Sequence, residues 1–384
     1  MRFRVERNEF TDAVSWTART LPQRPTGQLQ VLSGLMLGTT NDGVRLSAFD
    51  YEVAAEGTVP AAIADTGSAL VPGRLLAEIT RALPAAPIDV EADANRLVLT
   101  CGSTRFTLPL LPVEDYPDLP AMPDEVGRIE GAAFAAAVSQ VVVAAGRDET
   151  LPVLTGVRIE IAGERLLLAA TDRYRLAVRE MPWRPLEAAA SAAALIPSRT
   201  LNETAKALGA AGAEVVIALG GGSAGESLAG FAGGARRTTT RLVEGQFPDY
   251  RRLLPASCPL EAFIDGATLA EAVKRVRLVA AGTSPVRMQL SAGEVVLEAG
   301  SQQEAQAREA LPIDYDGPDL TVAFNHGYLL DGLSAVESDM VRVGFASADD
   351  PQESARKPVI LQGKVGDGAE TDYRYLLMPV RLPE

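Results

Sequence analysis

The pattern of apolar positions along the chain repeats three times. Apolar residues recur at i, i+3, i+4 and i+7, which predicts an amphipathic helix with one buried face in each repeat. The three stripes are Phe10, Ala13, Val14 and Thr17; Phe134, Ala137, Val138 and Val141; and Leu269, Ala272, Val273 and Val276. Their starts are separated by 134 − 10 = 124 and 269 − 134 = 135 residues.

A second helical element repeats with closer sequence agreement. Residues 71–78 (VPGRLLAE) match residues 196–203 (IPSRTLNE), and the offset is 199 − 74 = 125 residues. Proline is common near a helix start because its missing N–H has no helical partner there. A third copy begins at Phe324-Asn325. The pattern predicts a second helix in each repeat.

Strand patterns recur between these helices. Residues 44–50 parallel residues 166–172, and 295–299 are a third version. The alternating residues 51–56 predict a further strand that follows at once. A later strand is predicted to end in Tyr116-Pro117-Asp118 in the first repeat and in Phe247-Pro248-Asp249 in the second.

The order of these elements predicts an α+β fold made of three like domains. Helices that are apolar on one face must pack against a sheet. Proline-rich stretches at 120–123 and 255–259 mark the boundaries, so the predicted domains are residues 1–126, 127–256 and 257–384. Repeats of this size exceed those of short-repeat solenoids and favour a closed or curved array of domains.

Length and charge agree with this organisation. The chain has 384 residues, enough for two or three domains, and a formal net charge of −14. That charge argues against a protein held on nucleic acid by bulk positive charge, although one small basic surface remains possible. The start has no apolar signal segment, no run is long enough for a membrane helix, and Cys101 and Cys258 fit a reducing cytoplasm.

The residues give no indication of an enzyme. The single histidine, His326, cannot build a multi-histidine metal site and is interpreted as a polar residue near a helix start. Residues 220–225 (GGGSAG) formally satisfy G-x-G-x-x-G, but no helical pattern follows, so a hairpin loop is expected. No Walker A sequence is present. We therefore expect no metal, no cofactor and no catalytic residues.

Two clusters indicate binding instead. Basic residues repeat at equivalent helix positions, as Arg74 and Arg81 in the first repeat and Arg199 and Lys206 in the second, with Lys274, Arg275 and Arg277 on a helix of the third. Such repetition favours a shared phosphate-facing surface over ordinary solvated helix faces. The apolar stretch 375–382 is interpreted either as a core strand or as one wall of a groove for a partner peptide.

Taken together, these residues resemble the bacterial DNA polymerase III beta subunit, the sliding clamp family. The resemblance spans the whole chain. The segments that carry it are Arg24-Pro25, Phe49-Asp50-Tyr51-Glu52, Gly146-Arg147-Asp148-Glu149-Thr150, residues 170–177 (ATDRYRLA), residues 244–250 (EGQFPDY), Phe324-Asn325 and residues 378–382 (MPVRL).

The resemblance implies a homodimeric ring of six like domains around duplex DNA, with helices lining the hole and antiparallel sheets outside. Such a protein is a processivity factor that reads no base sequence. DNA-facing residues would be Arg24, Arg74, Arg147, Arg199, Lys274 and Arg275. The dimer interface would use Phe106, Leu108, Leu278 and Val279. A repeat-built interaction scaffold that does not encircle DNA is the alternative.

The family also binds the DNA polymerase III alpha subunit, the clamp loader and other replication and repair proteins through short peptides. By resemblance, these peptides would enter a pocket between the second and third domains. Its residues would be Leu154, Thr171, Arg173, Tyr174, Arg175, Leu176, Pro248, Arg252, Leu253, Asn325, Tyr328, Leu376, Met378, Pro379, Val380 and Arg381. Apolar side chains would form the cleft, and Arg and Asn would fix the peptide backbone.

Overall fold

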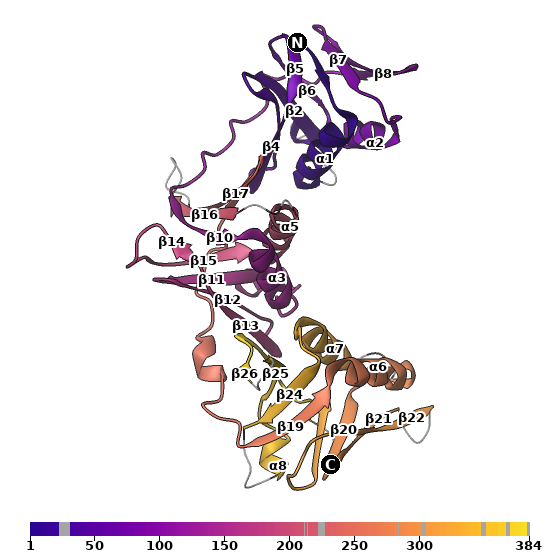
Figure 1. Cartoon of the computed structure of the whole chain (residues 1–384), viewed down its shortest axis with the longest axis vertical. Coiled ribbons are helices and arrows are strands. Elements are labelled where there is room, and N and C mark those ends of the chain that lie inside the picture. Colours follow the sequence, from indigo (N-terminus) through magenta and orange to yellow (C-terminus); the bar gives the residue numbers. More distant parts are fainter. Residues whose placement is uncertain are drawn as a thin grey trace. The chain divides into compact units, whose positions relative to one another are not determined.

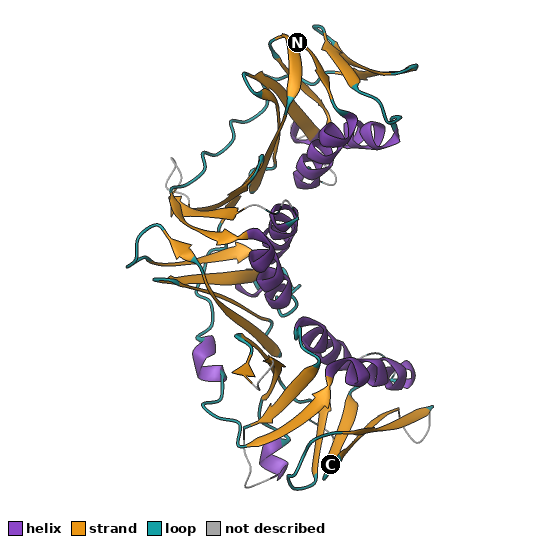
Figure 2. Ribbon diagram, viewed as in Figure 1, coloured by secondary structure: helices purple, strands orange, loops and turns teal. Residues whose placement is uncertain are grey.

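The structure, a computed structural model, describes residues 1–22, 31–210, 212, 214–221, 227–280, 282, 284–300, 305–346, 351–365 and 369–381. Its sheets are antiparallel, and helices pack against them (Figure 2). The chain divides into two compact units. Unit 1 contains Met1–Ala135, Arg184–Ala188 and Glu203–Leu242, and unit 2 contains Ala136–Trp183, Ala189–Asn202 and Val243–Glu384.

Unit 1 holds two sheets (Figure 1). The first has the order β5 (Ala61–Asp65), β1 (Arg2–Val5), β7 (Ile88–Ala92), β8 (Arg96–Cys101) and β9 (Thr104–Pro109). The second has the order β14 (Arg184–Pro185), β10 (Glu125–Glu130), β16 (Glu214–Gly221), β17 (Ser227–Gly233), β18 (Arg236–Arg241), β4 (Val53–Val59), β3 (Gly43–Phe49), β2 (Gly34–Thr40) and β6 (Ser68–Pro72).

Unit 2 also holds two main sheets. The larger has the order β15 (Ser191–Pro197), β11 (Gly156–Ala162), β12 (Arg165–Thr171), β13 (Arg175–Pro182), β27 (Tyr373–Leu377), β25 (Val359–Val365), β24 (Met340–Phe345) and β19 (Leu260–Asp265), and β26 (Ala369–Glu370) pairs with β25. The smaller has the order β22 (Gln306–Pro312), β21 (Glu294–Gly300), β20 (Val286–Ser291) and β23 (Leu320–Phe324).

The helices pack in pairs. In unit 1, α1 (Arg7–Thr17) contacts α2 (Gly73–Ala82), and in unit 2, α6 (Gly266–Val276) contacts α7 (His326–Ala335). The division between the units falls within α3 (Gly131–Val142) and within α5 (Ser198–Gly209). Short helical turns complete the fold: η1 (Ala18–Thr20), α4 (Pro152–Thr155), η3 (Tyr250–Leu253), η4 (Arg277–Val279) and α8 (Pro351–Ser354).

The predicted apolar stripes are confirmed. Phe10, Phe134 and Leu269, the first residue of each stripe, are fully buried. The buried face of each helix covers apolar side chains of a sheet, and burying a large apolar side chain contributes about 1.5–3 kcal/mol. Residues 44–49, 166–171 and 295–299 fall on β3, β12 and β21, whereas Asp50 and Asp172 follow their strands directly. Residues 220–225 are followed by a strand rather than a helix.

Three predicted strand segments differ from the structure. Tyr51 and Glu52 form a turn, and β4 begins only at Val53, because Tyr51 has φ 74°, which no strand accommodates. The segments ending in Tyr116-Pro117-Asp118 and Phe247-Pro248-Asp249 are not strands, since β9 ends at Pro109 and β18 at Arg241.

Each unit contains a strand pairing between distant parts of the sequence. In unit 1, β4 pairs with β18, and in unit 2, β13 pairs with β27. The predicted second domain, 127–256, therefore contributes strands to both units. The domain boundaries themselves stay a prediction.

Candidate functional site

The turn from β12 to β13 carries several residues predicted to line the partner pocket. Asp172 Oδ1 accepts hydrogen bonds from the backbone N–H of Tyr174 (3.0 Å) and of Arg175 (3.1 Å). Arg173 has φ 81°, a conformation that costs a residue other than glycine about 1–2 kcal/mol. The Thr171 hydroxyl donates to the Arg175 carbonyl (2.7 Å) and accepts from Arg173 N–H (3.2 Å). This turn presents Tyr174, which is 53 % exposed.

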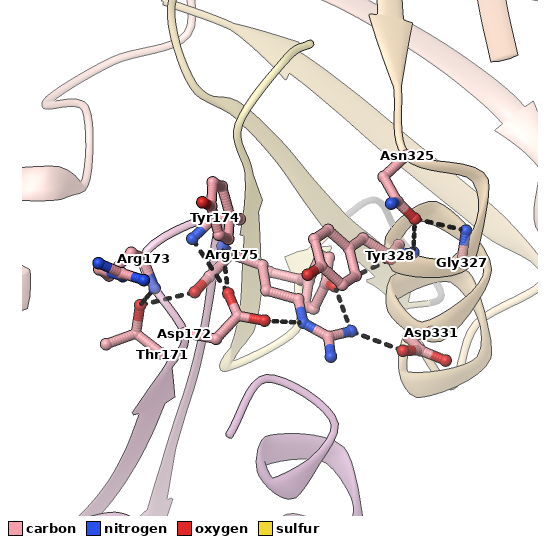
Figure 3. A network of polar contacts seen from close by, with 10 residues as sticks. Thr171, Asp172, Arg173, Tyr174, Arg175, Asn325, Gly327, Tyr328 and Asp331 are labelled. Carbon is pink, nitrogen blue, oxygen red and sulfur yellow. Dashed lines mark hydrogen bonds and ion pairs between the residues drawn. The ribbon is translucent and has the colours of Figure 1, made fainter. Parts of the chain in front are cut away.

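Arg175 links three elements of unit 2 (Figure 3). Its guanidinium donates to Asp172 Oδ2 (2.9 Å), to Asp331 Oδ2 on α7 (2.5 Å) and to the Tyr375 hydroxyl on β27 (3.4 Å). It also lies over the Tyr328 ring, with Cζ 4.2 Å from the ring centroid. Burial disfavours the charged form, but Tyr375 and Asp331 outweigh this effect and raise the pKa of Arg175. The side chain is therefore a buried cation that holds β13, β27 and α7 together.

The start of α7 places an aromatic ring beside the turn. The Asn325 side chain caps this helix by accepting hydrogen bonds from the backbone N–H of Gly327 (2.9 Å) and Tyr328 (3.1 Å). The Tyr328 and Tyr174 rings are stacked, with centroids 6.3 Å apart. Burial, and then the nearby Asp172 charge, raise the pKa of Tyr328, so its ring stays neutral near pH 7.

Close packing of α7 on β27 fixes the floor of this region. Tyr375 is fully buried, and its hydroxyl donates to the Tyr328 carbonyl (2.9 Å). A Cβ on Gly332 would lie 2.5 Å from the Tyr375 ring, so only glycine allows this approach. Burial raises the pKa of Tyr375 above its ordinary value and keeps the hydroxyl a donor.

These elements enclose a cavity of about 490 Å³ within unit 2. Its volume lies in the range of small-ligand and peptide side-chain sites. The lining residues are Ala145, Gly146, Arg147, Asp148, Leu151, Leu154, Asp172, Arg173, Tyr174, Arg175, Asn325, Gly327, Tyr328 and Asp331. The structure thus brings together these predicted pocket residues: Leu154, Arg173, Tyr174, Arg175, Asn325 and Tyr328.

An apolar cluster contains further predicted residues. Leu176 and Leu376 are buried together, and Met378 packs against them half-buried. The segment after β27 is held at both ends, because Met378 N–H donates to the Tyr174 carbonyl (2.9 Å) and Val380 N–H to the Ala323 carbonyl (2.8 Å). Pro379 is half-buried, whereas Val380 and Arg381 are exposed.

The last predicted pocket residues lie on residues 243–254, which we call the arm. Phe247 and Tyr250 of the arm are buried in the same apolar cluster as Leu176. Between and after them, Pro248, Arg252 and Leu253 are exposed. The site therefore combines a polar cavity with an apolar surface, both built from segments far apart in the sequence.

Three sequence models of one family match consecutive parts of the chain. They describe the N-terminal, central and C-terminal domains of the DNA polymerase III beta subunit and match residues 1–120, 128–249 and 251–381. The chain belongs to the DNA polymerase III beta subunit family. Members of this family are accessory subunits without catalysis of their own, so the chain is not an enzyme.

Relatives of known name agree with the family. A beta sliding clamp of Streptomyces coelicolor is 50 % identical over 384 residues and is covered, like this chain, over 100 % of its length. A Streptomyces muensis protein named beta sliding clamp homolog GriR is 40 % identical over 382 residues, 99 % of each chain. The crystal structure of a Pseudomonas aeruginosa sliding clamp bound to griselimycin is 27 % identical, with a TM-score of 0.89 and 100 % of both chains covered. The predicted clamp fold is confirmed.

Several residues around this cavity were not predicted from the sequence. Asp331 and Tyr375 carry the polar network, and Gly332 permits its packing. Asp331 lies three residues after Tyr328 on the same helix, so helical spacing could have indicated it. Arg147, predicted to face DNA, lines the cavity.

Among the described residues, Arg74, Arg199, Lys274 and Arg275 are also predicted to face DNA; they lie on helices and have partners in the chain. Arg74 on α2 donates to the carbonyls of Leu21 (3.0 Å) and Pro22 (3.2 Å). Lys274 and Arg275 on α6 form exposed ion pairs with Glu271 (2.7 Å) and Glu309 (2.5 Å). Arg199 is exposed on α5, and Arg24 lies outside the described residues. Exposed ion pairs are weak, so these side chains can exchange partners.

The residues predicted for the dimer interface differ in exposure. Phe106 is half-buried on β9, an edge strand of its sheet. Leu108, on the same strand, is fully buried in the core of unit 1 and offers no surface to another subunit. Leu278 in η4 is 81 % exposed, the largest exposure of any described large apolar side chain, and Val279 is half-buried.

The residues that the structure describes include no helix suited to span a membrane and no cluster of metal ligands. No helix there is both long and apolar enough to cross a membrane. No group of three or more His, Cys, Asp or Glu side chains within the described ranges is arranged to hold a metal ion.

Proposed function

We propose that two copies of the chain close head to tail into a ring around duplex DNA in the cytoplasm, with helices of three clamp domains (1–126, 127–256 and 257–384) lining the hole. Such a ring is a polymerase processivity factor. It tethers by topology, so its phosphate contacts must be weak enough to slide. The net charge of −14 suits this, because only a locally basic hole then accepts DNA.

The partner pocket is the part of this function that the geometry supports best. The observation that carries it is the convergence of the Thr171–Arg175 turn, the start of α7, the 376–381 segment and the arm around the cavity and the apolar cluster. A peptide with an apolar anchor would seat on the half-buried Met378 and its half-buried neighbour Pro379, and Met378 packs on the buried Leu176 and Leu376 beneath. Its polar backbone would meet Arg173, Arg175 and Asn325. The DNA polymerase III alpha subunit and the clamp loader are the expected partners.

Peptide titration tests the pocket. A fluorescein-labelled peptide with the core Gln-Leu-Asp-Leu-Phe should bind the intact protein and lose at least about 30-fold in affinity to the Met378→Ala/Pro379→Ala variant, as removal of a hot spot of about 2 kcal/mol requires. Equal affinity for both proteins would place the pocket elsewhere.

Retention on DNA tests the proposed lumen. Replacing Arg199 or Arg74 by Glu should shorten the time a loaded ring stays on linear DNA. Removing one phosphate-binding side chain should also reduce the salt slope of binding by about one. Unchanged retention and unchanged slope would remove these residues from the DNA-facing surface.

Ring closure is tested by mass. We place Phe106 of one subunit against the surface that carries Leu278 and Val279 in the next, because a solvent-exposed leucine and an open edge strand both favour pairing with another chain. Phe106→Ala should shift sedimentation toward the monomer. A dimer mass that persists at low concentration would exclude this interface.

A further inference from the structure

The arm combines a buried side with an exposed side. Val243, Phe247, Tyr250 and Leu254 pack on apolar residues of the large sheet in unit 2. The residues that face outward are Pro248, Arg252 and Leu253, and the Arg252 side chain is 85 % exposed. The shape of that outward side therefore depends on what holds the arm to the sheet.

Backbone contacts hold only parts of the arm. Val243 N–H donates to the Leu195 carbonyl of β15 (2.8 Å), and this fixes its start. Gly245 follows with φ 124°, a conformation that glycine adopts freely. The hydrogen bonds of the η3 turn, from Tyr250 N–H to the Pro248 carbonyl (2.8 Å) and from Arg252 N–H to the Asp249 carbonyl (3.3 Å), stay within the arm. They fix its local shape but not its position on the sheet.

Glu160 of β11 supplies polar contacts between the sheet and the turn. Its carboxylate accepts hydrogen bonds from the Arg251 guanidinium and from the Tyr250 hydroxyl (3.3 Å), and Arg158 Nε holds the same carboxylate from β11 (3.0 Å). The Arg251 guanidinium also lies 5.0 Å from the centroid of the Tyr250 ring. Burial and then the Glu160 charge raise the pKa of Tyr250 to about 12, so this hydroxyl is a donor near pH 7. Charge-assisted hydrogen bonds of this kind are about twice as strong as neutral ones.

A second cavity, of about 480 Å³, lies against the arm beside these contacts. Glu160, Leu167 and Glu180 of the sheet line it, with Tyr250, Arg251 and Leu254 of the arm. Pro248, Arg252 and Leu253 do not line it. The turn thus borders open space that its outward residues do not line. Beside this cavity, the Glu160 contacts are polar contacts that add to the apolar packing of Phe247 and Tyr250 in holding the turn.

We propose that Glu160 is a positioning residue for partner binding: it anchors the arm through Arg251 and Tyr250 and so sets the place of Pro248, Arg252 and Leu253 in the partner pocket. The inference rests on the proposed function, since it concerns the same pocket. Glu160 itself touches no partner. Its effect passes entirely through the arm, and this distinguishes it from a residue that binds the peptide.

The test is peptide titration of Glu160→Gln against the intact protein, with the fluorescein-labelled Gln-Leu-Asp-Leu-Phe peptide. The variant keeps the size of the side chain but removes the charge, and we expect affinity to fall about 5- to 20-fold. Glu180→Gln is the matched control. Glu180 lies on the same sheet and pairs with Arg165 (2.8 Å), which is not in the arm, so affinity should not change.

A coupling experiment separates positioning from a general structural role. If Glu160 acts through the arm, adding Glu160→Gln to Leu253→Ala should lower peptide affinity by less than about 2-fold, because Leu253→Ala has already removed an outward side chain. Hydrogen exchange at Arg252 N–H should also rise in Glu160→Gln alone. Arg251→Ala, which leaves β11 untouched, should reproduce the fall in affinity and serves as the second variant if Glu160→Gln folds poorly.

The outcomes are distinct. Unchanged affinity in Glu160→Gln and Arg251→Ala, with normal binding by the intact protein, would overturn the role of Glu160 and leave the pocket in place. If the losses of peptide affinity from Glu160→Gln and Leu253→Ala were fully additive in the double variant, Glu160 would have a general structural role and the positioning role would be overturned. Failure of the intact protein to bind the peptide would overturn the pocket and this inference together.

Discussion

The β4–β18 pairing of unit 1 and the β13–β27 pairing of unit 2 are built on one backbone plan. We call them, each with the turn before it, the first and the second junction. In both turns an aspartate, Asp50 or Asp172, accepts two backbone N–H groups. The next residue, Tyr51 or Arg173, has a positive φ of 74° or 81°. In each junction the carbonyl of the following residue, Glu52 or Tyr174, accepts a hydrogen bond of 2.9 Å from a backbone N–H of a segment distant in the sequence.

The side chains on this shared plan differ. Where the first junction has Val53, the second has Arg175, with its carboxylate, tyrosine and helix partners. The segment that donates this hydrogen bond differs too. Arg241 N–H is the donor at the first junction, and Met378 N–H is the donor at the second. The cavity of about 490 Å³, lined by Arg173, Tyr174 and Tyr328, lies at the second junction.

A helix carbonyl shows the same divergence. At the first junction the Ala207 carbonyl accepts from Arg236 (3.4 Å), whose guanidinium lies over the Trp16 ring. At the second, the corresponding Ala335 carbonyl accepts from Gln140 Nε2 (3.0 Å). A duplicated backbone thus fixes how the strands pair, while a few side chains make the two junctions chemically different.

The largest expected difference follows from Arg175→Ala. The substitution leaves two carboxylates without their cation in a partly buried site, and we expect unit 2 to be destabilised by about 3 kcal/mol. Val53→Ala, at the equivalent place in the first junction, should cost about 1 kcal/mol, because only partly buried methyl groups are removed. Urea unfolding, monitored by hydrogen exchange in each unit, measures both losses of stability. Equal losses of stability would mean that the network contributes nothing beyond packing.

A smaller difference is expected at the helix carbonyls. Gln140→Leu leaves the Ala335 carbonyl unsatisfied beneath a buried side chain, which costs about 1–3 kcal/mol. Arg236→Ala should cost at most about 1 kcal/mol, since the site is half-exposed and water can replace the guanidinium. Thermal unfolding of the two variants ranks them. If Arg236→Ala lost more stability than Gln140→Leu, the carbonyl at the second junction would not be the less accessible to water.

Glycine substitution at the strained turn residues should separate stability from binding. Arg173→Gly and Tyr51→Gly both relieve a positive φ, and each should raise the free energy of unfolding by up to about 1 kcal/mol. Only Arg173→Gly should weaken peptide binding. If Tyr51→Gly weakened it equally, the peptide would not be specific to the second junction.

The smallest expected effect depends on pH. Burial raises the pKa of Glu160, but hydrogen bonds from Arg251 and Arg158 outweigh it and hold the pKa below the ordinary value of 4.5. The depressed pKa means that the stabilising contribution is present above pH 4.5 and disappears as pH falls through the folded-state value. The melting temperatures of intact protein and Glu160→Gln should therefore differ at pH 7 and converge in acid. A constant difference across this range would contradict ionic anchoring.

The repeated helices could be predicted from the sequence because each stripe, such as the one starting at Phe10, is a local pattern contained within two helical turns. The clamp fold could be predicted through resemblance. The apolar 375–382 stretch allows two interpretations, and β27 combines them: it is a core strand of its sheet, and the residues after it border the proposed pocket.

Other features needed coordinates. A basic side chain carries no sign of which surface it will face: Arg147, which the resemblance assigns to DNA, lines the cavity, and its contact with DNA stays a prediction. Phe247 and Tyr250 are residue types typical of strands, which favours a strand for the arm, yet their spacing suits a short helical turn laid over a sheet. Helical spacing from Tyr328 indicates the face on which Asp331 lies, but the ion pair of Asp331 with Arg175 could not be predicted because the two are 156 residues apart.

The pairing of β13 with β27 has a consequence for how the chain folds while it is being made. Arg175 and its partner Tyr375 are 200 residues apart, and β27 lies in the interior of its sheet. At about 5–20 residues per second, a ribosome delivers β27 about 10–40 s after β13. Throughout that interval β13 is an unpaired strand edge, open to neighbouring nascent chains. The feature that forms the second junction therefore also sets its period of greatest exposure to aggregation.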